Sequence, residues 1–130
     1  MSDVPANLKY TKDHEWARLE GSTVIIGVTA HAQAALGDVV YVELPKVGDT
    51  LTAHQPFGVI ESTKAVSELF APLSGKVVNV NLTLTDSPHI INQDPHGKGW
   101  IVELEPANLK DLEGLLDAPA YEKLLQDTAK

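Results

Sequence analysis

The sequence contains no cysteine, and it is short of basic residues, aromatic residues and long apolar runs. Without cysteine, disulfides, thiolate metal ligands and cysteine nucleophiles are excluded. The 10 lysines and arginines are outnumbered by 18 aspartates and glutamates, which gives a formal net charge of −8. That balance argues against a nucleic-acid partner, because such a partner needs a basic surface. No apolar run is long enough to cross a bilayer, so we expect no membrane contact.

What is present is typical of one globular domain: 130 residues, of which 43% are hydrophobic and 22% charged. We therefore expect a single domain over residues 1–130, with a core over about 8–106 and C-terminal helices over about 108–127. The segment Met1–Asn7 lacks a basic region followed by an apolar one, so no secretory signal is expected. These features favour a cytoplasmic protein, and the small size and acidity favour a monomer.

The residue pattern predicts many short strands followed by a helical tail. Thr29 is expected to cap a helix over 30–36 that Gly37 ends. A short helical turn over about 85–91 and a loop over 92–99 should precede the last strand. Leucines at helical spacing over 109–116, and a last helix that starts near 117–119, follow Pro106. Strands are expected at 8–10, 14–19, 23–28, 38–44, 50–53, 57–60, 65–71, 75–80 and 100–104.

The most informative segment is a hairpin pattern centred on Lys64. An apolar run, Phe57 to Ile60, leads into a short polar turn, and a second partly apolar run leads out again before Pro72. This pattern predicts a β-hairpin with one amine at its apex. Small neighbours, Thr63 and Ala65, would leave that amine open to a modifying enzyme. The pattern therefore favours a protein that is acylated on Lys64 and acts as a carrier and not as a catalyst, although most lysines are solvated surface residues.

Several blocks of sequence around this hairpin resemble, in the same order, the glycine cleavage system H-protein family. The lysine segment is similar to that family's lipoylation segment, and the similarity extends from about Tyr10 to about Tyr121. The matching blocks are 10–16 (Tyr-Thr-Lys-Asp-His-Glu-Trp), 27–33 with 36–45, 61–68 with 72–75, and 86–88 with 91–92 and 94–100.

The resemblance implies a mainly β fold, a lipoyl-domain-like barrel-sandwich hybrid of two small antiparallel sheets with short flanking helices and a C-terminal helical tail. It also implies that Lys64 carries lipoate as an amide. Glu61, three residues before the lysine, and Gly75, eleven after it, would help the lipoylating enzyme to recognise the hairpin. A glycine at Gly75 also has a local explanation, since the turn there could require positive φ.

The implied function is a shuttle with no catalysis of its own. Glycine decarboxylase, which uses pyridoxal phosphate, would load an aminomethyl group onto the arm. An aminomethyltransferase would pass the one-carbon unit to tetrahydrofolate, and dihydrolipoyl dehydrogenase would reoxidise the carrier. The lack of cysteine suits this role, because no protein thiol would exchange with the lipoyl sulfurs.

Two acidic positions, Glu15 and Glu68, match the family pattern and could hold the amine of a loaded arm in a groove. The alternative for each is a solvated surface glutamate. No metal site is expected, because the histidines show no ligand spacing, and we interpret them as surface or loop residues. They are His14, His31, His54, His89 and His96.

Four other functions remain open on the sequence alone. A biotin carrier domain would place methionines beside the lysine, whereas the only methionine here is Met1. A lipoyl domain of a 2-oxoacid dehydrogenase would favour aspartate before the lysine and lack the helical tail. The fold could serve as an unmodified binding module, or the chain could hand lipoate or octanoate to other proteins.

Overall fold

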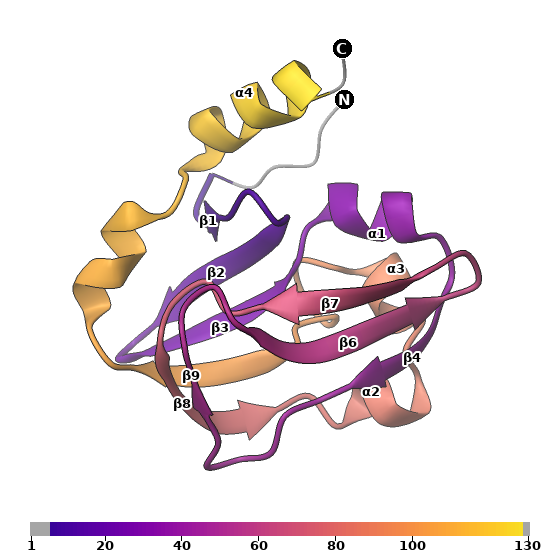
Figure 1. Ribbon diagram of the computed structural model, residues 1–130, viewed down its shortest axis with the longest axis horizontal. Coiled ribbons are helices and arrows are strands. Elements are labelled where there is room, and N and C mark those ends of the chain that lie inside the picture. The colour runs from indigo at the N-terminus through magenta and orange to yellow at the C-terminus, as the bar shows by residue number, and fades with distance from the viewer. Residues whose placement is uncertain (1–5, 129–130) are drawn as a thin grey trace.

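The computed structural model describes residues 6–128, and within that range the chain folds into two antiparallel sheets (Figure 1). The larger sheet has six strands in the order β1-β2-β3-β9-β8-β5, and the smaller has three in the order β4-β6-β7. The predicted mainly β architecture, with two antiparallel sheets, short helices and a C-terminal helix, is confirmed. The strands are β1 (Lys9–Tyr10), β2 (Glu15–Glu20), β3 (Thr23–Val28), β4 (Val39–Glu43), β5 (Thr50–Leu51), β6 (Pro56–Ser62), β7 (Val66–Phe70), β8 (Gly75–Val80) and β9 (Val102–Pro106).

The main hydrophobic core joins the two sheets. Its buried side chains come from both of them, among them Ile26, Val77 and Leu104 on the larger sheet and Ile60 and Leu69 on the smaller one. Burying an aliphatic side chain of this size contributes about 1.5–3 kcal/mol of transfer free energy. Because Ile60 and Leu69 belong to β6 and β7, the core anchors the body of this hairpin and leaves its tip to project (Figure 1).

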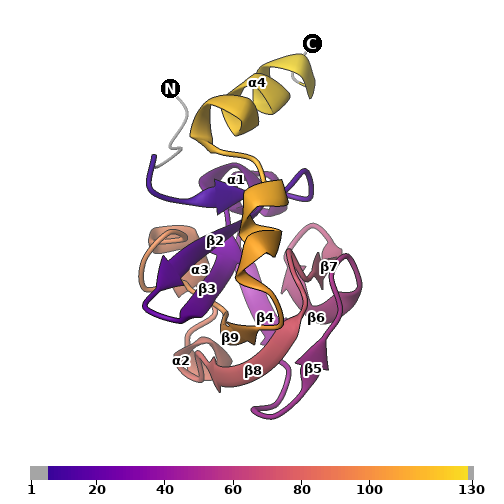
Figure 2. The ribbon, with the colours of Figure 1, turned by 90° about the vertical axis from the view of Figure 1, so that its left-hand side faces the viewer.

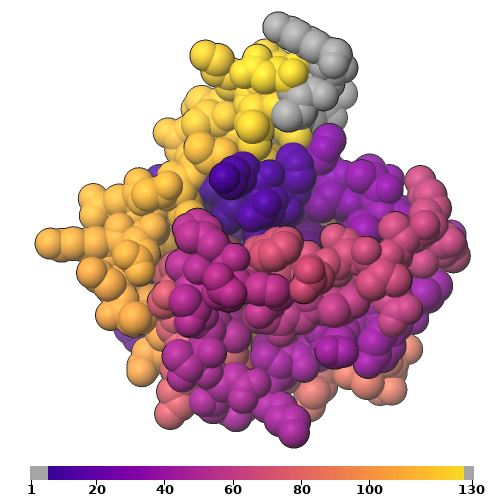
Figure 3. Space-filling view, viewed as in Figure 1, coloured from indigo at the N-terminus to yellow at the C-terminus, as the bar shows by residue number. Residues whose placement is uncertain are grey.

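A second cluster attaches the C-terminal segment to the first strand. The rings of Tyr10 and Tyr121 stack with centroids 4.6 Å apart, and both side chains are fully buried. Tyr10 and Leu116 also exchange two backbone hydrogen bonds of 2.7 and 2.8 Å. Tyr121 lies on the last helix, α4 (Ala118–Thr128). Figures 2 and 3 show this orange-to-yellow segment along one side and the top of the sandwich, beside the indigo N-terminal strands.

Helix α1 (Ala30–Leu36) forms where the capping pattern predicted it. The Thr29 side chain accepts a hydrogen bond from the Ala32 N–H at 3.2 Å, and Gly37 ends the helix with φ of +79°. A left-handed φ of this kind favours glycine because glycine has no Cβ. The helix therefore ends at a defined residue, and the chain turns directly into β4.

The expected helical turn over 85–91 is wrong, because the chain forms two separate short helices there. They are α2 (Thr83–Asp86) and α3 (Ile90–Gln93). Ser87 separates them with φ of −134°, and the residue before a proline, here Pro88, is disfavoured in helical conformation. The expected loop over 92–99 is also too long by two residues, since Asn92 and Gln93 belong to α3.

Of the leucines over 109–116, Leu109 and Leu112 lie in a 3₁₀-helix, η1 (Leu109–Gly114), and Leu115 and Leu116 follow it. Leucines at 109, 112 and 115 are spaced by three, which is the period of a 3₁₀-helix. Leu112 and Leu115 pack against the main core. The last strand also begins later than expected, at Val102, although Ile101 already bonds to Ile26.

No helix within residues 6–128 combines the length and apolar character needed to span a membrane. The sequence-based expectation for Met1–Asn7 falls largely on residues 1–5, and the ends of the expected 1–130 domain fall on residues 1–5 and 129–130. Both lie outside the described residues.

Candidate functional site

Lys64 lies at the exposed tip of the hairpin formed by β6 and β7, as the residue pattern predicted. The turn is closed by a backbone hydrogen bond from the Ser62 N–H to the Ala65 carbonyl at 2.8 Å. The Ser62 hydroxyl oxygen also accepts the N–H groups of Lys64 at 3.2 Å and Ala65 at 3.1 Å. A serine that bonds to following backbone N–H groups stabilises a tight turn. The amine is therefore presented from an ordered backbone and not from a loose loop.

The tip does not stand alone, because it contacts the segment between α1 and β4. The Thr63 N–H donates to the Asp38 carbonyl at 3.0 Å, beside the β4–β6 pairing of Val39 with Ser62. The aliphatic part of the Lys64 side chain lies against Gly37, where an added Cβ would come within 2.7 Å of Cε. The lysine stem thus lies in a space that exists because residue 37 has no side chain.

Glu61 lies one residue before the turn, on β6, and is half-buried. Its strand neighbours are Tyr41 on one side and Val66 on the other, both exposed. Residues directly opposite each other in antiparallel strands project on the same face. Glu61 and Lys64 therefore belong to one exposed end of the smaller sheet.

Gly75 is not brought next to Lys64. It opens β8 in the larger sheet, past the base of the hairpin. The suggested local reason, a positive φ, is wrong, because Gly75 is not among the residues with left-handed φ. The structure gives a different one: an added Cβ would lie 2.6 Å from the Glu105 carbonyl oxygen, so only glycine lets β9 approach so closely.

A groove of about 320 Å³ brings Glu15 and Glu68 together. It starts beside the hairpin tip at Ala65 and lies between the beginning of β2, helix α1 and strand β7. Its wall is largely apolar, and the two glutamates come from different strands, Glu15 from β2 and Glu68 from β7. The lining includes Glu15, Glu68, Ala32, Ala35, Leu36 and Val66.

The two glutamates of the groove differ in their surroundings. Glu15 is only 2% exposed, whereas Glu68 is exposed. Burial raises the pKa of Glu15 to about 7; hydrogen bonds from the Phe70 N–H at 3.1 Å and the Thr11 hydroxyl at 2.9 Å oppose that rise. Such a carboxyl group changes protonation near neutral pH. The interpretation of Glu15 as a solvated surface residue is therefore wrong.

His14, just before Glu15, was not recognised from the sequence as a special residue. It has φ of +67°, and its Nδ1 shares a hydrogen bond of 2.8 Å with the Tyr121 hydroxyl. That hydroxyl also bonds the Thr29 side chain at 2.8 Å. Burial, followed by the nearby His31, lowers the pKa of His14. A half-buried histidine with fixed partners differs from the expected surface residue, and His96, whose ring accepts the Ala30 N–H at 3.1 Å, differs likewise.

Asn92 and Gly37 were also missed, because their roles depend on contacts between distant segments. The Asn92 amide on α3 bonds the backbone at 37 and 39, on either side of Asp38. The sequence contains an asparagine in a polar segment, which by itself predicts only a turn.

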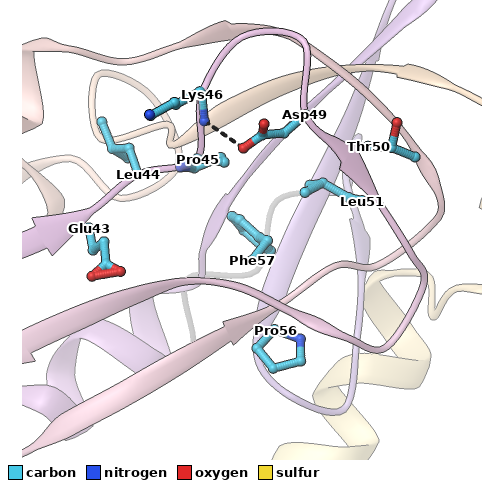
Figure 4. Close-up of a pocket in the computed structure, with 9 residues that line it drawn as sticks. All are labelled: Glu43, Leu44, Pro45, Lys46, Asp49, Thr50, Leu51, Pro56 and Phe57. Carbon is cyan, nitrogen blue, oxygen red and sulfur yellow. Dashed lines mark hydrogen bonds between the residues drawn. The ribbon is translucent and has the colours of Figure 1, made fainter.

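A larger hollow of about 580 Å³ lies at the other end of β6 from Lys64 (Figure 4). Phe57 and Leu51 contribute apolar surface, and Glu43, Lys46 and Asp49 lie at its rim. Asp49 uses a carboxylate oxygen to accept the Lys46 N–H at 3.0 Å, so part of this polar character belongs to a turn. Among residues 6–128, no group of three or more histidine, aspartate or glutamate side chains is arranged to hold a metal ion.

The two-sheet fold and the lysine at an ordered hairpin tip define a lipoyl-domain-like sandwich. The comparisons with known proteins are more specific. The family described as Glycine cleavage H-protein matches residues 8–128. The glycine cleavage system H protein of Myxococcus xanthus is 62% identical over 129 residues, which cover 98% of this chain and 100% of that protein. The one from Symbiobacterium thermophilum is 55% identical over 127 residues, covering 98% and 99%.

A solved structure agrees with the sequence relatives. The crystal structure of a glycine cleavage system H protein from Mycobacterium marinum superimposes with a TM-score of 0.84 at 38% identity, covering 98% of this chain and 100% of that one. The chain belongs to the glycine cleavage H-protein family.

Proposed function

We propose that this chain is a non-catalytic carrier of the glycine cleavage system that bears lipoate as an amide on Nζ of Lys64. The observation that carries the proposal is the exposed Lys64 at the apex of a hydrogen-bonded hairpin, in a member of the H-protein family. An enzyme that acylates a folded protein needs an accessible amine in a repeatable place. Exposed neighbours at Thr63 and Ala65 leave that access open.

The surroundings of Lys64 suit a long, largely apolar arm. The groove beside the tip offers apolar walls from Ala32, Ala35 and Leu36 next to two carboxyl groups. When bound, lipoate supplies a disulfide that takes up an aminomethyl group and is left reduced. The chain itself provides the lysine to which the arm is attached, projects that lysine from the sandwich, and offers a surface to which the partner enzymes bind.

The partners that follow from this role are enzymes of the same system. We propose glycine decarboxylase with its pyridoxal phosphate as the loading enzyme, and an aminomethyltransferase that uses tetrahydrofolate as the unloading enzyme. Dihydrolipoyl dehydrogenase would restore the oxidised carrier, and a lipoylating enzyme would attach the arm in the first place. Glu61, beside the tip, and Gly75 are the proposed recognition residues of that last enzyme.

Glu15 and Glu68 are proposed to hold the amine of a loaded arm. A buried carboxyl group with a pKa of about 7 is partly ionised near neutral pH, and a neighbouring ammonium group favours its charged form. Variants Glu15→Gln and Glu68→Gln should shorten the lifetime of the loaded arm, measured as release of formaldehyde and ammonia from purified loaded protein. An unchanged lifetime in both variants would remove the groove from the proposal.

The carrier proposal is tested by the intact mass of protein produced in cells supplied with lipoate and a lipoylating enzyme. The expected result is one lipoyl adduct, which fragmentation locates on Lys64 and which the Lys64→Arg variant lacks. The modified protein should then support exchange of the glycine carboxyl carbon by glycine decarboxylase, whereas the unmodified protein should not.

Two other results would reject the proposal, and a third would extend it. A biotin adduct on Lys64 would indicate a carboxylase carrier, and the absence of any adduct would leave a binding module with a lipoyl-like fold. Transfer of lipoate from the modified chain to unmodified acceptor domains would identify an additional relay function.

A further inference from the structure

The hairpin tip contacts the segment between α1 and β4, and these contacts point to a way in which the position of Lys64 is fixed. We infer that Asn92 and Gly37 are positioning residues for modification of Lys64: they build a platform on which the lysine stem and the tip backbone are held. The platform consists of Gly37 and Asp38, between α1 and β4, and Val39, the first residue of β4. This inference rests on the proposed function, because it assigns a role in the attachment of the arm.

The tip is held by this platform at two adjacent points. The Asp38 carbonyl accepts the Thr63 N–H at 3.0 Å, so the residue just before the lysine is fixed. One residue further along, the lysine stem lies against Gly37, close enough that a Cβ there would come within 2.7 Å of Cε. Backbone and side chain of the tip are thus supported from the same side.

Asn92 fixes the platform from the other side. Its Nδ2 donates to the Gly37 carbonyl at 2.8 Å and to Oε1 of Gln33 at 3.0 Å, and its Oδ1 accepts the Val39 N–H at 2.9 Å. The amide can face only one way, because two acceptors require the nitrogen and one donor requires the oxygen. The bonds to residues 37 and 39 flank Asp38, the residue that holds the tip.

The arrangement connects three elements at one end of the molecule. Figure 1 shows α1, α3 and the tip of the β6–β7 hairpin at this end, with the chain from α1 to β4 beside the tip. The tip itself is exposed, so without the platform its order would depend on the Ser62 turn and the β6–β7 pairing beside it. An enzyme that binds the lysine would then have to order the tip during binding, which weakens recognition.

The test is the kinetics of lipoylation with a purified lipoylating enzyme, lipoate and ATP, followed by intact mass at varied concentrations of the unmodified protein. Asn92→Ala should lower kcat/KM by about threefold to tenfold, the effect of releasing one or two ordered groups. Gly37→Ala should do the same, because its Cβ meets the lysine side chain and because the φ of +79° at this residue disfavours alanine. Asn92→Asp retains the acceptor for Val39 but turns an oxygen toward the Gly37 carbonyl and Oε1 of Gln33, so it should lower kcat/KM at least as much as Asn92→Ala.

A matched control distinguishes positioning from general stability. Asn81 is a buried asparagine whose Nδ2 donates to the Lys98 carbonyl at 2.9 Å and the Trp100 carbonyl at 2.8 Å, outside the platform. Asn81→Ala should be destabilised, like Asn92→Ala, but should keep the native kcat/KM at temperatures where both are folded. Amide hydrogen exchange at Thr63 and Lys64 should speed up in the Asn92 and Gly37 variants but not in Asn81→Ala.

The outcomes separate this inference from the carrier proposal. If the native chain is modified on Lys64 but folded Asn92→Ala, Asn92→Asp and Gly37→Ala all retain native kcat/KM and native exchange at Thr63, the platform role is wrong and the carrier proposal stands. If Asn81→Ala slows lipoylation as much as Asn92→Ala, the effect is one of stability and the inference is also wrong. If the native chain is not modified, the carrier proposal fails and this inference fails with it.

Discussion

The Tyr121 hydroxyl on the last helix lies 2.8 Å from Nδ1 of His14, the residue that precedes the buried Glu15. His14 is one of two residues other than glycine with positive φ among residues 6–128, the second being His54. A left-handed conformation at a residue of this kind is strained and persists only where surrounding contacts fix it. The C-terminal helix thus provides a contact that holds the beginning of β2, which lines the groove that contains Glu15 and Glu68.

The first prediction concerns that contact. Tyr121→Phe keeps the stack on Tyr10 but leaves the Thr29 hydroxyl and His14 without their shared partner. Losing the partner of buried polar groups costs about 1–3 kcal/mol, so the free energy of unfolding in urea should fall by that amount. Tyr41→Phe is the control, because Tyr41 is 48% exposed and its variant should unfold like the native protein. Equal stability of both variants would show that the hydroxyl contact contributes nothing.

The second prediction concerns the pH dependence that Glu15 gives to stability. The pKa of this group is raised from 4.5 to about 7 on folding, so the folded protein retains a proton that the unfolded chain releases. Stability should therefore fall as pH rises from about 4.5 to about 7, and the loss should be complete above that range. A shift of this size corresponds to about 3 kcal/mol.

The Glu15→Gln variant checks the sign and the source. Glutamine resembles the protonated carboxyl group and does not ionise, so the difference in unfolding free energy between variant and native protein should grow in favour of the variant between pH 5 and pH 8. Urea titrations at several pH values measure this directly. If the difference is constant with pH, Glu15 is not the group that titrates.

How much of the fold and of the candidate site could be predicted depends on how far apart in the sequence the interacting residues are. The hairpin and α1 were predicted because their signals are local: β-branched runs around a polar turn, and Thr29 and Gly37 at either end of a helix. Lys64 was placed at the tip for the same reason. The helices over 83–93 were predicted poorly, since a single proline divides a segment whose composition gives no clear period.

The parts of the site that were not predicted depend on residues far apart in the chain. Nothing near His14 indicates that Tyr121 will bond to it, and nothing near Asn92 indicates a contact with Gly37. The burial of Glu15 likewise results from the approach of β7, whose Phe70 N–H bonds the carboxylate. Such contacts follow from the packing of the two sheets and the tail, which sequence periodicity does not specify.

The third prediction concerns the turn that presents the lysine. Ser62→Ala removes the oxygen that accepts the N–H groups of Lys64 and Ala65. Both groups are exposed, so water replaces the bond and the loss of unfolding free energy should be below about 1 kcal/mol. Hydrogen exchange at Lys64 and Ala65 should nevertheless accelerate. Ser62→Thr keeps a hydroxyl at this position and should retain slow exchange. Unchanged exchange in Ser62→Ala would mean that the hydroxyl does not protect the turn.

The last prediction separates two explanations of Gly75. An alanine there would place Cβ 2.6 Å from the Glu105 carbonyl oxygen, a backbone atom that cannot move without shifting β9. We expect Gly75→Ala to lose about 1–3 kcal/mol of unfolding free energy, as overpacking in a well-packed site does. Gly114→Ala is the matched control, because no atom lies within 4 Å of an added Cβ there and no positive φ is required.

Lipoylation of folded Gly75→Ala then decides the role of the residue. A native kcat/KM for the folded fraction would make the glycine structural, whereas a reduced value that Gly114→Ala does not share would support recognition by the lipoylating enzyme. Glu61→Ala is expected to behave in the opposite way. Glu61 is half-buried beside the tip, so this variant should lower the kcat/KM of lipoylation with little change in unfolding free energy.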